Sequence, residues 1–135
     1  MPTQMKNDLL LTLALCFVTS CGGGSDPKTL TNDGSAALGA GKYAEAAESF
    51  EGALAGMDAA NPDWMRAKMG LVEALVHTDP ARAKTEFLAL ARAGTSKVTD
   101  RDFALIGQKF GQAGKLTEAA EILNAGMEMH AASPQ

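Results

Sequence analysis

From Pro27 onward, apolar side chains recur at positions i, i+3, i+4 and i+7, which is the spacing of one face of an α-helix. Turn and capping signals divide this pattern into six segments. We expect helices near 28–40, 43–57, 62–77, 80–93, 100–113 and 116–131. Aromatic residues make up only 5% of the chain. Because strands favour aromatic and β-branched side chains, the composition also disfavours a sheet, and the sequence predicts an all-α fold.

The helix boundaries are marked by capping residues. Three expected helices start where Asp or Asn precedes proline, at Asp26-Pro27, Asn61-Pro62 and Asp79-Pro80. The Asp or Asn side chain can accept from the unpaired amides of the first turn, and proline lacks an N–H that would be unpaired there. Thr99 and Asp102 predict a capping box. Gly41 and Gly114 are predicted to end helices.

The segments repeat in pairs along the chain. Ala46, Ala83 and Ala119 align at spacings of 37 and 36 residues. Four residues after each stand Phe50, Phe87 and Leu123, and three further on stand Ala53, Leu90 and Gly126. Small residues at such positions allow the two helices of a pair to approach closely, and the large ones fill the space between one pair and the next.

This pattern resembles the tetratricopeptide repeat. The first copy supplies Gly34, Ala37, Gly41, Tyr43, Ala46, Phe50 and Ala53. The resemblance covers residues 27–131, as copies at about 27–60, 62–97 and 99–131, before a C-terminal tail at 132–135. It implies three helix-turn-helix pairs stacked as a short right-handed α-solenoid. The spacings exceed the roughly 34 residues of the family, so we expect longer junctions, and a plain helical bundle with Ala-rich seams is the alternative.

The first 20 residues have the pattern of a secretory signal. Lys6 lies in a short polar start, and a run of 10 residues at 9–18, apolar apart from Thr12, follows it. That run is too short to span a bilayer as a helix, which needs about 20 residues, but it has the length of a signal's apolar region. We expect residues 1–20 to be removed, together with Cys16.

The leader ends in Val18-Thr19-Ser20-Cys21, which resembles the lipobox of bacterial lipoproteins. The resemblance implies that the Cys21 thiol carries a lipid and that residues 21–26, rich in glycine, are a flexible tether to a membrane. Gly22 follows the cysteine where Asp is associated with inner-membrane retention. We therefore expect the periplasmic face of the outer membrane, in a host that has one. Ordinary signal cleavage, giving a soluble periplasmic or secreted protein, is the alternative.

The sequence offers no catalytic site, metal site or cofactor motif. His77 and His130 are the only histidines, and neither has a partner at metal-ligand spacing. The net charge is −4 with no cluster of Lys and Arg, so we expect no nucleic-acid partner. The sequence therefore predicts a non-enzymatic protein.

The tetratricopeptide resemblance implies that the first helix of each pair lines a partner groove. Carried over to this chain, the groove positions are Lys28, Thr31, Asn32 and Ser35, then Met65, Lys68, Met69 and Val72, then Arg101, Ala104, Leu105 and Gln108. The centre of such a groove is apolar and rich in methionine, which adapts to varied partners. The same methionines could instead belong to the core.

The last helix carries two apolar stripes. Leu116, Ala119, Leu123 and Met127 form the first, and Ile122, Ala125 and Met129 form the second. We expect the second to fold against its neighbours or to dock another chain, including self-association. The predicted function is a protein–protein interaction scaffold or adaptor of the bacterial cell envelope, with other envelope proteins or peptides as partners. The alternatives are a non-catalytic subunit of an envelope enzyme complex and, without lipid, a soluble chaperone-like domain.

Overall fold

The computed structural model describes residues 24–93 and 98–132. Over these ranges the protein is all-α, with six helices: α1 (Pro27–Gly39), α2 (Tyr43–Ala55), α3 (Trp64–Thr78), α4 (Pro80–Arg92), α5 (Asp100–Gln112) and α6 (Leu116–Ala131). Every boundary lies within two residues of its expected position, so the predicted helices are confirmed.

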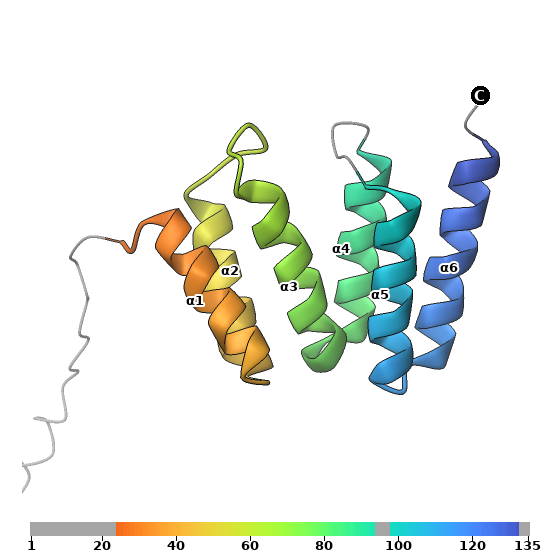
Figure 1. Ribbon diagram of the computed structural model, residues 1–135, viewed down its shortest axis with the longest axis horizontal. Helices are drawn as coiled ribbons and strands as arrows, with labels where there is room; N and C mark the ends of the chain where they lie inside the picture. The colour runs from red at the N-terminus through yellow and green to blue at the C-terminus, as the bar shows by residue number, and fades with distance from the viewer. Residues whose placement is uncertain (1–23, 94–97, 133–135) are drawn as a thin grey trace, which may run out of the picture.

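The helices follow one another across the molecule in chain order, with α1 at one end and α6 at the other (Figure 1). The two helices of each pair pack against each other, as do α2 and α3, and α3 also contacts α1 and α5. The predicted all-α, solenoid-like arrangement is therefore confirmed. One row of helices, α1, α3 and α5, presents a continuous surface because each member contacts the next.

The caps confirm most of the predicted boundaries. The Asp26 side chain accepts from the backbone N–H of Thr29 at 3.3 Å, and the Asp79 side chain accepts from that of Arg82 at 3.2 Å. At α5 the Asp102 carboxylate accepts from the Thr99 N–H at 2.7 Å, which completes the predicted capping box. These bonds satisfy amides that have no partner within the helix.

The cap predicted at Asn61-Pro62 is wrong. The Asn61 side chain accepts from the N–H of Asp63, only two residues on, at 2.9 Å. This is an Asx turn, in which the side chain closes a loop instead of capping a helix. Helix α3 therefore begins two residues later than expected, at Trp64.

Both predicted glycine stops are confirmed. Gly41 has φ 75° and Gly114 has φ 76°, in the left-handed region that side chains disfavour. After each, a backbone N–H returns to the helix: Lys42 donates to Ala37 at 2.9 Å, and Lys115 donates to Phe110 at 2.8 Å. This is the hydrogen bond of a Schellman motif.

The core depends on glycines that face large side chains. The Phe50 ring lies between Gly34 on α1 and Gly70 on α3, and a β-carbon on Gly34 would come within 2.9 Å of it. A β-carbon on Gly70 would lie 2.7 Å from two ring carbons and closer to a third. The ring is 1% exposed. Glycine at both positions is what allows three helices to close around one aromatic side chain.

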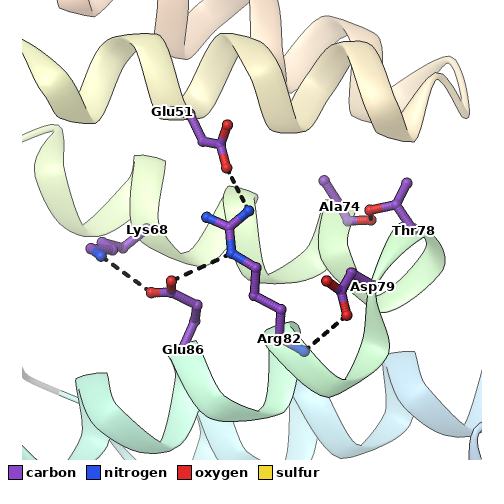
Figure 2. Close-up of polar contacts among 7 residues, drawn as sticks. All are labelled: Glu51, Lys68, Ala74, Thr78, Asp79, Arg82 and Glu86. Carbon is purple, nitrogen blue, oxygen red and sulfur yellow. Dashed lines mark hydrogen bonds and ion pairs between the residues drawn. The ribbon is translucent and has the colours of Figure 1, made fainter.

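Ion pairs link the second helix of one pair to the second helix of the next. Arg82 on α4 reaches Glu51 on α2 at 2.7 Å and Glu86 on its own helix at 3.7 Å (Figure 2). The hydrogen bond to Glu51 raises the pKa of Arg82 above its ordinary value. Further along, Lys84 on α4 pairs with Glu121 on α6. Opposite charges on the second helices of neighbouring pairs favour this stacking order, although each exposed pair contributes less than about 1 kcal/mol.

Candidate functional site

A groove runs across α1, α3 and α5, and we call it the α1–α3–α5 groove. It consists of two adjoining hollows of about 240 Å³ and 570 Å³. The smaller is lined by Ser35, Leu38, Phe50, Arg66, Met69, Gly70, Glu73, Leu105 and Ile106. The larger is lined by Ser35, Leu38, Gly39, Tyr43, Glu73, His77, Lys109 and Gln112. Because Ser35, Leu38 and Glu73 line both, the two hollows form one surface.

The middle of this groove is apolar. Leu38 and Met69 are half-buried and pack against the core. Leu105 on α5 is 42% exposed, which is high for a large apolar side chain. Gly70 also lines this hollow, beside the Phe50 ring that it contacts. An apolar side chain of a partner would replace water over these three residues.

The two cations beside the groove, Arg66 and Lys109, each contact a side chain of a neighbouring helix. Arg66 on α3 donates to the Asn32 side chain on α1. Lys109 on α5 forms an ion pair with Glu73 on α3. Each link joins two of the three helices that make the groove. Glu73 neutralises Lys109, whereas the neutral Asn32 amide leaves Arg66 with its positive charge and competes with an incoming carboxylate only as a hydrogen-bond acceptor.

An aromatic stack closes the polar end of the groove. The rings of Tyr43 and His77 lie 3.7 Å apart between centroids, with an angle of 9° between their planes. Tyr43 begins α2 and His77 lies in the last turn of α3, so the stack joins the first pair of helices to the next. Both rings line the larger hollow.

The structure places the predicted groove residues in different environments. Met69 and Leu105 line the groove, as does Ser35. The assignment of Val72 is wrong, because its side chain is 1% exposed and belongs to the core. Thr31 is also buried, and its hydroxyl donates to the Pro27 carbonyl at 2.8 Å.

Lys68 is turned away from the groove. Its ammonium lies 3.5 Å from Glu86 on α4 (Figure 2). The same ammonium lies 5.6 Å from the centre of the Trp64 ring. Met65 is half-buried and lines neither hollow. Arg101 and Gln108 are exposed on α5, but the groove is lined there by Leu105, Ile106, Lys109 and Gln112.

The groove assignment on α3 differs from the prediction by one residue of helix phase. Consecutive residues of a helix point about 100° apart. Moving the predicted set by one residue along α3 therefore replaces Lys68 with Met69 and Val72 with Glu73 in the groove. The signal that identifies the correct phase is charge: Glu73 and Lys109 are opposite in sign and one repeat, 36 residues, apart. Arg66 and Asn32, which are 34 residues apart, are joined by a hydrogen bond at a similar spacing.

Other site types have little support in the part of the chain that the structure describes. Within 24–93 and 98–132, no group of three or more His, Cys, Asp or Glu side chains is placed to hold a metal ion. Over the same ranges no helix has the length and hydropathy needed to cross a membrane. The predicted leader and Cys21 lie outside the described residues.

Comparisons with protein-family models, with curated proteins and with solved structures gave no match for this chain.

Proposed function

We propose that this protein is a non-enzymatic scaffold of the bacterial cell envelope. It is anchored by a lipid on Cys21, and its α1–α3–α5 groove holds an apolar segment of another envelope protein. The lipobox resemblance at Val18-Thr19-Ser20-Cys21 supports the anchor. The tetratricopeptide resemblance supports the scaffold role.

The observation that carries the binding proposal is the contrast between the floor and the rim of the groove. The floor exposes Leu38, Met69 and Leu105, whereas the nearby Arg66 and Lys109 are already engaged by partners within the protein. A carboxylate would have to compete with those partners for at most about 1 kcal/mol. Apolar burial offers about 25 cal/mol per Å² before the cost of ordering the partner. We therefore propose an extended or helical apolar segment as the occupant.

Site-specific photo-crosslinking in cells tests the groove. A photoreactive amino acid placed at Leu105 should capture a partner, and the same group at Glu48, exposed on α2, is the control. Captured proteins are identified by mass spectrometry. Equal capture from both positions, or capture from Glu48 alone, contradicts the groove proposal.

Binding of the captured partner is then measured with two variants of α5. Leu105→Asp should weaken binding by about 10-fold or more, because it places a charge on the apolar floor. Arg101→Ala, exposed on the same helix, should change it less than about 3-fold. Raising the salt concentration should have little effect. Loss of binding with Arg101→Ala together with a steep salt dependence would replace the apolar mode with an ionic one.

Fractionation of cells tests the anchor separately. Cys21→Ser should release the protein from membranes or leave it unprocessed, since serine has no thiol to accept the lipid. Thr19→Ala, which retains a small residue before the cysteine, is the control and should stay on membranes. If the Cys21→Ser variant is processed and fractionates like the parent, the protein is not a lipoprotein.

A further inference from the structure

The outer side of α6 has an apolar surface at the end of the array. Ile122 is buried, and Ala125 and Met129 are half-buried, so the second predicted stripe folds inward. The first stripe is left outside except for the buried Ala119: Leu116 is 71% exposed, Leu123 43% and Met127 65%. Beside it lies a hollow of about 440 Å³ between α5 and α6. We call this surface the terminal face.

In the two earlier repeats, a following helix covers the side chain that corresponds to Leu123. Leu123 occupies the repeat position of Phe50 and Phe87, which are 1% and 0% exposed. Phe50 is covered by Gly70 on the following helix, α3. Phe87 is covered by Phe103 on the following helix, α5, with ring centroids 5.0 Å apart. Leu123 contacts Gly107 on the preceding helix and is open on the other side. A covering helix would complete the pattern.

We propose that the covering helix is α6 of a second copy of this chain. The two α6 helices would run antiparallel about a two-fold axis, as consecutive helices of the array do. The exposed stripe is self-complementary about a point between Glu121 and Ile122. Leu116 and Met127 lie equally far from that point on either side, and so do Ala120 and Leu123. Each large side chain of one copy would then face Met127, Leu116 or the small Ala120 of the other, much as Phe50 faces Gly70.

The charges favour the antiparallel pairing. The stripe itself carries no charged residue, and the two charges beyond its ends, Lys115 and Glu128, lie equally far from the central point on opposite flanks of the helix. In the antiparallel arrangement the acidic end of one copy therefore lies level with the basic end of the other. A parallel pair would set like charges level, which is unfavourable.

A closed dimer fits better than a head-to-tail filament. A filament would require α1 of a second copy to fill the terminal face. The exposed side chains of α1 include Lys28, Asn32, Asp33 and Ala36, which offer no large apolar group. The isologous arrangement uses the apolar stripe twice, as a two-fold interface does. Helix α6 has 16 residues and is about 24 Å long, so the interface is smaller than a standard one, and we expect a Kd on the order of 1–100 µM.

Cysteine cross-linking tests both the dimer and its register. In the full-length chain with Cys16→Ser and Cys21→Ser, Leu116→Cys and Met127→Cys are made separately and then mixed under mild oxidation. The mixture should give a disulfide-linked pair of one chain of each kind. Either variant alone should cross-link weakly, because identical residues would lie about 16 Å apart along the helix. Strong cross-linking of one variant to itself would overturn the antiparallel register.

Sedimentation of the same serine-substituted chain tests the affinity. Met127→Glu should weaken the dimer by about 100-fold, since the two-fold axis places the charge in the interface twice. Leu105→Glu, exposed on the groove face instead, should leave the dimer unchanged, and circular dichroism of both variants verifies that the helices remain. A parent chain that sediments as a monomer at 100 µM, or a dimer unaffected by Met127→Glu, would overturn the proposal.

Discussion

Replacing Gly70 with alanine should destabilise the protein, although alanine is the better helix former. Gly70 lies within α3, where the exchange gains about 1 kcal/mol in helix propensity. The added methyl group would overlap the Phe50 ring. The ring cannot retreat, because Gly34 faces it from the other side at a distance that already excludes a β-carbon.

The magnitude follows from these opposing effects. Overpacking a tight core costs typically about 1–3 kcal/mol, and because the added carbon would overlap the Phe50 ring directly, we expect a cost of about 2–3 kcal/mol here. Subtracting the propensity gain of about 1 kcal/mol leaves an expected net loss of about 1–2 kcal/mol. The measurement is urea unfolding of the full chain followed by circular dichroism. Gly111→Ala is the matched control: it is the same exchange within α5, with open space where the methyl group would lie, and it should stabilise by about 0.5–1 kcal/mol.

A double-mutant cycle with Phe50→Leu identifies the cause. In the Phe50→Leu background the ring is gone, so Gly70→Ala should become neutral or stabilising, with a coupling free energy of about 1–3 kcal/mol between the two sites. If Gly70→Ala is at least as stable as the parent, or costs the same in both backgrounds, the close packing of α2 against α3 is not what requires glycine there.

Three further substitutions test separate parts of the fold by the same unfolding measurement. Ala119→Leu should destabilise by about 1–3 kcal/mol because Ala119 is buried at a helix contact, and an unchanged stability would mean that the contact is loose. Gly114→Ala should cost about 1 kcal/mol, entirely from its φ of 76°, since nothing lies near the added methyl group; a smaller cost than at Gly39→Ala would contradict this. Arg82→Gln should cost less than about 1 kcal/mol, and the cost should vanish at high salt if the pairs with Glu51 and Glu86 cause it.

The sequence alone determines the helices and most of their ends. Caps such as Asp79 and stops such as Gly41 act on groups three to five residues away, so a local pattern is enough to locate them. Asn61-Pro62 shows where this fails. An Asx turn and a helix cap use the same residue types, and which forms depends on how the loop before α3 must run to bring that helix onto α2.

The tertiary structure decides how each helix is rotated about its axis. Val72 and Met69 are both apolar residues of α3, and only packing shows that the first faces the core and the second faces the groove. The same holds for the two stripes of α6: Ile122 turns inward and Leu123 is left partly outside. Periodicity shows that a helix has an apolar face. When that face is wider than one neighbouring helix can cover, periodicity does not determine how the helix is rotated about its axis. Close contacts between residues distant in the chain, such as Gly70 against Phe50, settle it.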